Sequence, residues 1–496
     1  MYLKRNGKMV VSTVTVLILA LTATVWAGGF PGGHPEALGP RFEAASQVQE
    51  PPRRQEPPRE DDPASRIRYW NEIALNANAL DHTPVAPGEN RIFGEQIGPC
   101  RTSRAFAIVH IAIFDAVNAI AGGYQGYTSI APARAPTSMD AAIAQAAHDT
   151  LVSLFPSQAE SFDGLLAEDL GRIPDGREKK NGIDLGHRAA AAILKIRAYD
   201  GSQYAEPLIG IDFITSDKPG KWRQDPISQI PLALGAYWGK VKPFVMRSAG
   251  QFNVQPAPPL TSSEYTTAFN EVKRLGGDGI VTPTKRTEDQ TIAGIYWAYD
   301  GTPGLGTPPR LYNQIAVQIA EQKGSNAAEL ARLLALVNVA MADAAITCWE
   351  YKYKYQFWRP ITGIREADPG TGPTGLGDGN PATIGDPNFT PPFPAYASGH
   401  ATFGGTLFQI LRKFYRTDNI AFTFVSDEYN GVTTDNEGNL RPLIPRTFSS
   451  FSEAEEENGQ SRIYLGIHWA FDKTKGIANG REIADYVLKH AFVPRR

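Results

Sequence analysis

Beyond residue 65 the chain carries apolar residues at intervals of three and four, the spacing of one face of an α-helix. A single stretch, Phe422–Asn430, has the composition of a short strand, and no set of strands is sufficient for a sheet core. We therefore predict a mostly α protein. The predicted helices are Arg66–Leu80, Ser103–Ile120, Ser138–Leu154, Ser157–Leu170, Asn181–Tyr199, Ser262–Leu275, Arg286–Tyr299, Leu311–Gln322, Ala327–Tyr355, Gly399–Tyr415, Ser452–Gly466 and Lys475–His490.

Two long stretches interrupt this periodicity. Gly201–Leu260 contains Pro and Trp without a clear period, and Ala367–Ala397 is dense in Gly and Pro, so both are expected to be irregular. A chain of 496 residues can form two or three domain-sized units. We predict two helical bundles with long irregular connecting loops, an N-terminal bundle at 66–260 and a C-terminal bundle at 261–496 that carries the functional site.

The N-terminus has the pattern of an export signal. Basic residues precede an apolar stretch over 9–27, which ends in Val25-Trp26-Ala27. We predict a secretory signal peptide over 1–27, and hence a secreted or periplasmic protein. An uncleaved membrane anchor is the alternative, because a stretch of this length can just span a bilayer. Residues 28–65 are rich in Pro, Gly and charge, which predicts a disordered linker.

Charge and cysteine content limit the function further. The formal net charge is -3 with no basic stripe, so we expect no nucleic-acid partner. Cys100 and Cys348 are the two cysteines. Export would permit a disulfide between them, and a buried free thiol in the helical run around Cys348 is equally consistent with the sequence.

Lys352 and Arg359 form the first of three clusters of chemically useful residues. They are seven residues apart, close to two helical turns, which predicts one shared helix face with about 10 Å between them. Pro360 favours an extended conformation at Arg359, at the helix end. Such a pair is usually a solvated basic face, but here Trp349, Trp358 and other aromatic residues surround it.

Ser398, Gly399 and His400 form the second cluster, directly before an amphipathic helix. Serine is a good N-cap, and the unpaired N–H groups of a first helical turn attract anions, to which glycine allows close approach. A plain N-cap is the alternative. The positive end of the helix should lower the pKa of His400, which suits acid–base work near neutral pH.

Arg462 and His468 form the third cluster. They are six residues apart, about 240° around a helix, so a helix break at Gly466 is needed to direct both at one point. Asp472 could accept one imidazole N–H and leave the other nitrogen of His468 free as a ligand or nucleophile. A structural core histidine is the alternative. Taken together, the three clusters suit a tetrahedral oxyanion such as phosphate or vanadate.

The combined pattern resembles the vanadium-dependent haloperoxidases, within the superfamily that includes type 2 phosphatidic acid phosphatases and bacterial acid phosphatases. The shared pattern is K-x6-R-P, then P-S-G-H, then S-R-x5-H-x3-D, and this chain departs from it only at Ala397, where proline is usual. The resemblance is closer to the fungal-type chloroperoxidase branch and covers roughly Gly294 to Leu488.

This resemblance implies a vanadate cofactor and a role for each matched residue. His468 would bind vanadium, and His400 would act as acid–base residue in a catalytic set with Lys352 and Asp300, the latter pairing with a site arginine. Family members with histidine at the position of Phe393 tend to be bromoperoxidases, and phenylalanine goes with chloride activity. The vanadate oxygens would be held by Lys352, Arg359, Ser398, Gly399 and Arg462, and the halide region would include Trp349 and Phe393.

The predicted function is therefore oxidation of chloride or bromide by hydrogen peroxide. Its product would be diffusible hypohalous acid, free or taken up by a small organic acceptor, with no stable membrane partner. The alternative is a secreted acid phosphatase with a phosphohistidine at His468 and with His400 protonating the leaving alcohol. A non-catalytic helical module is disfavoured, because buried clustered cations without an anion are costly.

Overall fold

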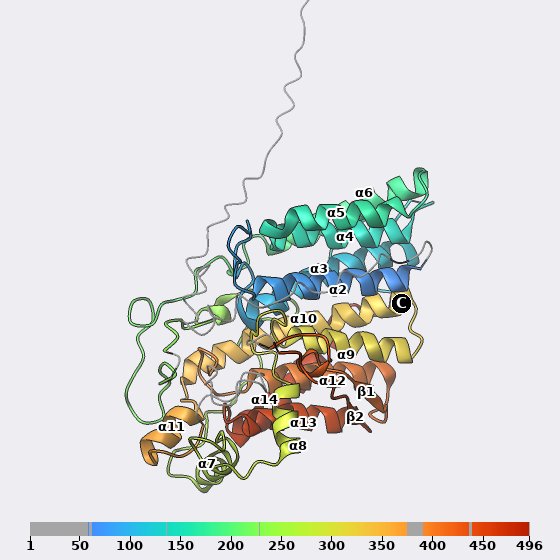
Figure 1. Ribbon diagram of the computed structural model, residues 1–496. Helices are drawn as coiled ribbons and strands as arrows, with labels where there is room; N and C mark the ends of the chain where they lie inside the picture. Colours follow the sequence, from blue (N-terminus) through green and yellow to red (C-terminus); the bar gives the residue numbers. More distant parts are fainter. Residues whose placement is uncertain are drawn as a thin grey trace, which may run out of the picture.

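The computed structural model describes residues 58, 62–134, 136–227, 229–373, 390–435 and 439–495. The predicted signal peptide and nearly all of the predicted linker lie outside these described residues. Helices dominate and confirm the mostly α prediction, and Figure 1 shows them stacked in layers. From one side of the stack to the other the layers contain α4 (Met139–Leu154), α5 (Ala159–Gly171) and α6 (Arg177–Arg197), then α2 (Pro63–Asp81) and α3 (Gly98–Ala121), then α9 (Pro309–Gln322) and α10 (Ala327–Tyr355), then α12 (Gly399–Tyr415), α13 (Phe451–Tyr464) and α14 (Ala470–His490).

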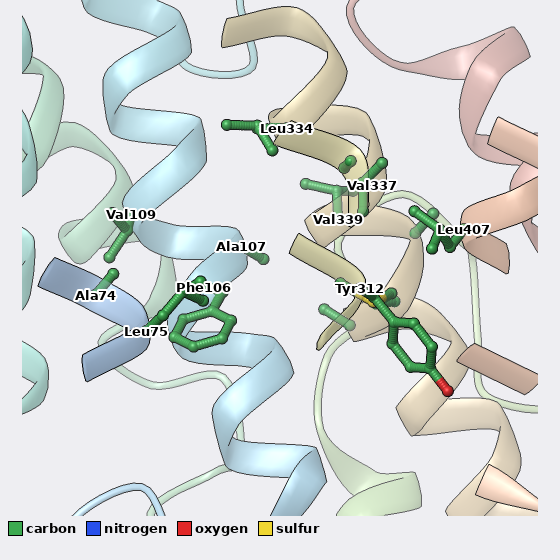
Figure 2. Packing of buried hydrophobic residues seen from close by; sticks show 14 of the residues in the cluster. Ala74, Leu75, Phe106, Ala107, Val109, Tyr312, Leu334, Val337, Val339 and Leu407 are labelled. Atoms are coloured by element: carbon green, nitrogen blue, oxygen red, sulfur yellow. The ribbon is translucent and has the colours of Figure 1, made fainter. Parts of the chain in front are cut away.

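Helix α10 occupies the centre of the stack (Figure 1) and packs against α3 on one side and against α12 and α14 on the other. Figure 2 shows Phe106 of α3, Leu334 of α10 and Leu407 of α12 in one buried cluster. Within the described part of the chain, α3 and α10 are long and apolar enough to span a membrane, but 83% and 94% of their apolar windows are buried inside the protein. Both therefore have the burial of core helices in a globular protein.

The observed helices differ from the predicted ones at several ends, including the start of α3 at Gly98 instead of Ser103, and two differences bear on the site. Helix α11 (Pro360–Ala367) was not predicted, because Pro360 was interpreted as a break, whereas proline is also well suited to a first helical turn. Helix α14 begins at Ala470 instead of Lys475, because the Asp472 carboxylate accepts the Trp469 N–H at 3.0 Å and caps an earlier start. The remaining helices, α7 (Ser263–Leu275) and α8 (Glu288–Tyr296), lie close to their predicted ranges.

A small hairpin is the one sheet among the described residues. β1 (Phe422–Phe424) pairs antiparallel with β2 (Arg446–Phe448), with Thr423 opposite Thr447. The predicted strand over 422–430 is therefore correct only at its start, and the chain then forms a 3₁₀ turn at Asp427–Tyr429. The stretch 201–260 is irregular as predicted, apart from a 3₁₀ turn at Trp238–Lys240.

Both cysteines are free and buried, so the structure contains no bond between Cys100 and Cys348. The larger buried cluster runs from Ile67 to Phe492 and includes helices from both predicted bundles. The bundle boundary at residue 260 stays a prediction.

Candidate active site

A pocket lies where the starts of α12 and α14 meet the segment after α8 and residues of the N-terminal half. Lys352, Arg359 and Ser398 are buried beside this pocket without lining it. The predicted site residues that line it are Asp300, Trp349, Phe393, Gly399, His400, Arg462 and His468. The fold thus brings all three sequence clusters and Asp300 to one place.

His468 has one nitrogen committed and one available. Its Nδ1 lies 2.8 Å from Oδ2 of Asp472, which is the predicted contact. Burial and then the neighbouring cations Arg359 and Lys352 hold the pKa of His468 well below its usual value, so the ring is neutral. Nδ1 therefore donates its proton to Asp472, and Nε2 keeps a lone pair, toward which Nη1 of Arg359 points at 3.0 Å.

The chain break at Gly466 is also confirmed. Helix α13 ends at Tyr464, Gly466 has a φ of 76°, and α14 begins at Ala470. This left-handed residue favours glycine. It lets Arg462 and His468 reach the same pocket, which one straight helix would not allow.

Arg359 does not share a helix face with Lys352, so that prediction is wrong. Helix α10 ends at Tyr355, Gln356 has a φ of 51°, and Arg359 is the N-cap of the next helix with a ψ of 152°. The extended conformation expected before Pro360 is present. Arg359 donates from Nε to the Phe393 carbonyl at 2.9 Å and so joins the loop before α12 to His468.

Lys352 is fully buried in the last turn of α10. Its Nζ donates to the carbonyl oxygens of Pro394 and Ala395 at 2.8 and 2.9 Å. Burial lowers the pKa of Lys352 to about 7. The charge of Lys352 behind the pocket wall therefore depends on pH near neutrality. Its two hydrogen bonds also hold the loop that carries Phe393 in place.

Ser398 is the N-cap of α12, as predicted, and its Oγ accepts the Ala401 N–H at 3.4 Å. Because Oγ only accepts in this bond, the hydroxyl proton remains available to donate elsewhere. Gly399 packs against Trp349, since a Cβ at this position would lie 3.1 Å from the Trp349 ring. The first turn of α12 therefore brings its backbone N–H groups to the pocket with no side chain in front of Gly399.

Arg462 supplies donors that are not used elsewhere in the described residues. Its Nη2 pairs with Oδ2 of Asp300, while Nε and Nη1 are buried without a hydrogen-bond partner there. Burial raises the pKa of Asp300, and Arg462 opposes this shift. A buried guanidinium with two unsatisfied N–H groups at a pocket wall is the donor set that an oxyanion needs.

His400 is neutral and in a defined tautomer. Burial, followed by the charge of Arg462, holds its pKa well below the usual value. The prediction of a lowered pKa is thus confirmed, with burial rather than the helix end as the main cause. Nε2 lies 2.6 Å from the Ala298 carbonyl oxygen, so it carries the proton and Nδ1 keeps the lone pair.

Trp349 and Phe393 form the predicted aromatic wall, with ring centroids 4.8 Å apart. Trp349 donates from Nε1 to the Leu234 carbonyl at 3.1 Å. Its ring lies where a Cβ on Gly235 would be, and Gly235 has a φ of 77°, so this position favours glycine. The irregular middle of the chain therefore fixes the orientation of Trp349.

Several lining residues were not predicted, and they come from the N-terminal half. His82 lines the pocket, with Nδ1 2.8 Å from the Asn78 carbonyl oxygen and Nε2 accepting the Gly98 N–H at 2.9 Å. Burial lowers the pKa of His82 to about 4. No spacing or motif marks His82 or Leu234, because they reach the pocket only through tertiary packing.

The residues present fit a tetrahedral oxyanion bound to a histidine. The neutral His468 offers a lone pair at Nε2, and Arg462 offers two buried N–H groups. Lys352 and Arg359 add positive charge from behind the wall. Among the described lining residues, Asp300 is the one acidic side chain that offsets this positive charge.

Comparison with known proteins gives a consistent picture. The model of the VCPO second helical-bundle domain family matches residues 332–494. Vanadium chloroperoxidase from Curvularia inaequalis is 31% identical over the aligned region, which covers 82% of this chain and 78% of that protein.

Solved structures share the fold at lower identity. The crystal structure of a bacterial vanadium-dependent iodoperoxidase has a TM-score of 0.68 at 23% identity, covering 88% of this chain and 98% of that one. A holo-type bacterial vanadium-dependent chloroperoxidase has a TM-score of 0.62 at 15% identity, with 84% and 96% covered. The fold therefore extends over nearly the whole described chain.

Proposed function

This chain belongs to the vanadium-dependent haloperoxidase family, and we propose on that premise that the pocket at His468 converts chloride or bromide into hypohalous acid. The protein is a vanadium-dependent halide peroxidase with vanadate as cofactor and with hydrogen peroxide and halide as substrates. The observation that best supports this location is the neutral His468, whose Nε2 keeps a lone pair in the pocket that Arg462, with its unsatisfied donors, also lines.

We assign the cofactor contacts to the residues collected at this pocket. Nε2 of His468 would bind vanadium, because Asp472 already occupies its other nitrogen. The vanadate oxygens would be held by Lys352, Arg359, Ser398, Gly399 and Arg462. When bound, vanadate supplies a Lewis acid that activates hydrogen peroxide without changing its own oxidation state.

His400 would move the protons of the reaction. The overall conversion takes hydrogen peroxide, halide and one proton to hypohalous acid and water. The Nε2–H of His400 donates to the Ala298 carbonyl oxygen. Nδ1 therefore carries the lone pair that can take a proton from the peroxide and return it. Asp300 pairs with Arg462 and so orients this arginine in the same pocket as His400.

The halide site would be the apolar wall of Trp349 and Phe393. Lys352 Nζ and the Arg359 guanidinium lie 5.1 and 5.0 Å from the Phe393 ring centroid, so a halide against this ring stays close to two cations. We expect Phe393→His to lower chloride turnover relative to bromide. An unchanged ratio in steady-state assays with both halides would contradict this role.

Halogenation of a dimedone-type acceptor tests the proposed function. The purified protein is assayed with hydrogen peroxide and chloride or bromide, before and after addition of orthovanadate. We expect activity only with vanadate, and inhibition of reconstitution by millimolar phosphate, which would occupy the same donors. Inactivity with every halide, together with hydrolysis of a phosphate monoester, would favour the acid phosphatase instead.

We also propose that the protein is exported. The basic and apolar pattern of residues 1–27, which lie outside the described residues, supports this proposal. Sequencing the N-terminus of the secreted or periplasmic protein should find a start at Gly28. A chain that retains Met1 and stays with the membrane fraction would favour the anchor.

A further inference from the structure

Tyr299 has a backbone conformation that needs outside support. It lies three residues after the end of α8, is fully buried, and has a φ of 47°, in the left-handed region that bulky residues rarely adopt. Such a conformation is strained and persists only where its surroundings hold it. The conformation matters because the next residue is Asp300, the partner of Arg462.

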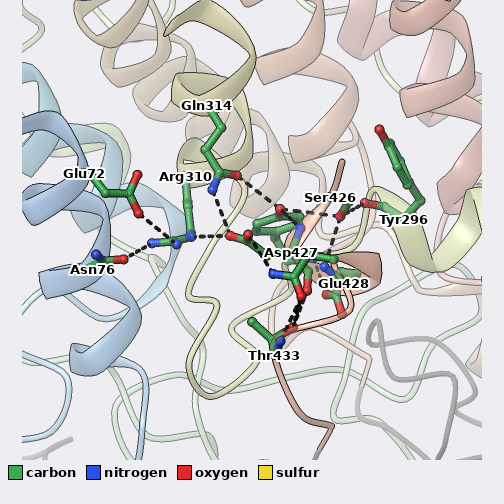
Figure 3. Close-up of polar contacts among 11 residues, drawn as sticks. Glu72, Asn76, Tyr296, Arg310, Gln314, Ser426, Asp427, Glu428 and Thr433 are labelled. Atoms are coloured by element: carbon green, nitrogen blue, oxygen red, sulfur yellow. Dashed lines mark hydrogen bonds and ion pairs between the residues drawn. The ribbon is translucent and has the colours of Figure 1, made fainter. Parts of the chain in front are cut away.

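The support comes from the segment after β1, residues 426–428. Oε1 of Glu428 accepts the Tyr299 N–H at 3.1 Å, and the Tyr299 hydroxyl accepts the Asp427 N–H at 2.6 Å. Ser426 Oγ donates to the Tyr296 carbonyl at 2.7 Å, as Figure 3 shows. This segment therefore holds Tyr299 at both its backbone and its side chain.

Glu428 is in turn held by Arg441. Both residues are buried, and Nη1 of Arg441 donates to Oε2 of Glu428 at 2.6 Å. Burial raises the pKa of Glu428 to about 8, while Arg441 opposes the shift. One carboxyl oxygen of Glu428 thus pairs with Arg441 and the other accepts the Tyr299 N–H. The two contacts together fix the position of the Glu428 side chain.

The residues on either side of Tyr299, Ala298 and Asp300, each bind a side chain that lines the pocket. The Ala298 carbonyl accepts the Nε2–H of His400 at 2.6 Å, and the Asp300 carboxylate pairs with Nη2 of Arg462. A change in the Tyr299 backbone would move the two partners together. Of the residues that hold it, Glu428 is the one whose side chain binds that backbone directly.

We propose that Glu428, fixed by Arg441, is a positioning residue that keeps Asp300 against Arg462 and so sets the affinity of the pocket for its oxyanion. Glu428 is not among the residues that line the pocket. It acts through Tyr299 and Asp300. The inference rests on the proposed function, because it concerns the same oxyanion pocket.

A double-mutant cycle on vanadate binding tests this role. The affinity of the apoprotein for orthovanadate is measured by equilibrium dialysis for the natural chain, Glu428→Ala, Asp300→Ala and the double variant. We expect Glu428→Ala to weaken binding about tenfold in the natural chain and less than about twofold in the Asp300→Ala background. An equal factor in both backgrounds would overturn the proposal.

Two further variants separate positioning from general stability. Glu428→Gln keeps an oxygen for the Tyr299 N–H, so it should recover part of the affinity lost in Glu428→Ala; no recovery would contradict the contact as the cause. Glu455 is an equally buried glutamate paired with Arg412 at 2.7 Å, and Glu455→Ala should lower the melting temperature while leaving vanadate affinity unchanged. Loss of affinity in Glu455→Ala would show that any destabilisation has this effect.

A third variant keeps the cycle possible if Glu428→Ala does not fold. Arg441→Met removes the residue that fixes Glu428 and can replace Glu428→Ala in the same cycle. Failure of the natural apoprotein to bind orthovanadate would overturn the proposed function itself. Binding with additive effects would overturn only the positioning role.

Discussion

His468 shows how one neighbour can define the chemistry of a side chain. Asp472 takes the proton on Nδ1, and burial beside Arg359 and Lys352 keeps the ring neutral. Protonation would bring a further positive charge into a pocket that already contains several. The nitrogen that faces the pocket therefore keeps its lone pair at pH values at which an ordinary histidine would already be protonated.

This arrangement leads to a prediction for His468→Ala. The variant should lose stable vanadate binding, because it removes the imidazole nitrogen that Asp472 orients toward the pocket and that we propose as the vanadium ligand. The vanadium retained after exhaustive dialysis measures the effect. His490→Ala, at the exposed end of the same helix α14, serves as the control; retention of vanadium by His468→Ala at the control level would refute the role.

At this scale the sequence predicted most of the site, because the useful residues lie in short local patterns. Ser398 before an amphipathic run and Asp472 four residues after His468 need only local geometry to be understood. The relation of Lys352 to Arg359 was wrong because the helix ends between them. His82 could not be predicted, since it meets the pocket only through the packing of distant segments.

The contact between α12 and α14 depends on residues without side chains. A Cβ on Gly480 would overlap the Thr402 carbonyl oxygen, and a Cβ on Gly405 would lie 2.6 Å from the Ile477 carbonyl oxygen. The two helices therefore approach more closely than any larger residue would allow. Helix α12 begins at Ser398, and α14 begins just after His468, so this close contact sets the distance between two parts of the site.

We expect Gly480→Ala to separate the two helices and destabilise the protein by about 1 to 3 kcal/mol, the usual range for overpacking a buried contact. Vanadate affinity should fall with it, because the starts of both helices shift. Urea unfolding and equilibrium dialysis measure the two effects. Ala478→Ser, on the exposed face of α14, is the control; equal stability of both variants would contradict the close contact.

His82 couples the end of α2 to the start of α3, through its bonds to Asn78 and Gly98. Its pKa of about 4 in the folded protein lies below the ordinary value of 6.5. Between these values the unfolded chain binds a proton that the folded chain does not. Stability should therefore fall as pH falls through this window, by up to about 1.4 kcal/mol per pH unit.

A titration of stability checks this sign. Gln at position 82 can keep one donor and one acceptor but does not bind the proton. The unfolding free energies of the natural chain and His82→Gln should therefore approach each other by about 2 kcal/mol between pH 7 and pH 5. A constant difference between the two urea unfolding curves over this range would exclude His82 as the cause.

Helix positions were predictable because apolar spacing is a property of each segment alone. The exceptions have tertiary causes or ambiguous signals. The start of α14 depends on a cap formed by Asp472, and α11 was hidden by a proline that either ends or starts a helix. The turn at Asp427–Tyr429 replaced a predicted strand, because its side chains join a buried polar network instead of a ladder.

At the scale of the whole molecule, one arginine joins the two halves of the chain. Arg310 of α9 pairs with Asp427 at 2.7 Å and donates to Asn76 of α2 at 2.9 Å, and it also lies near Glu72 (Figure 3). Asp427 carries an N–H that binds Tyr299, next to the active site. The network therefore connects the N-terminal helices with the segment that supports the pocket.

Replacing this arginine should be costly. We expect Arg310→Met to destabilise the protein by about 3 kcal/mol, because Asp427, which is largely shielded from solvent, would lose its counter-charge. Arg68→Met is the matched control, since Arg68 pairs with Glu321 between the same helices α2 and α9 but at a more exposed position. Its effect should stay below about 1 kcal/mol in urea unfolding; similar losses in both variants would contradict the importance of burial.

The order of the layers could not be predicted from the sequence, because periodicity defines a helix face without naming its partner. The sequence places α3 in a first bundle and α10 in a second, yet the two helices pack against each other in one core. The same limitation hid the contribution of Leu234 to the aromatic wall. Long-range pairing is decided by shape and burial of whole faces.

The central place of α10 has a consequence for biosynthesis. Helix α3 ends at Ala121, but the helix that covers its apolar face begins only at Ala327. At synthesis rates of about 5–20 residues per second, the ribosome needs roughly 10 to 40 s to make the segment between them. During that interval α3 can pack against α4 and α6, but the face that meets α10 has no partner, so we expect this face to be the part of α3 most exposed to aggregation before translation has passed the middle of the chain.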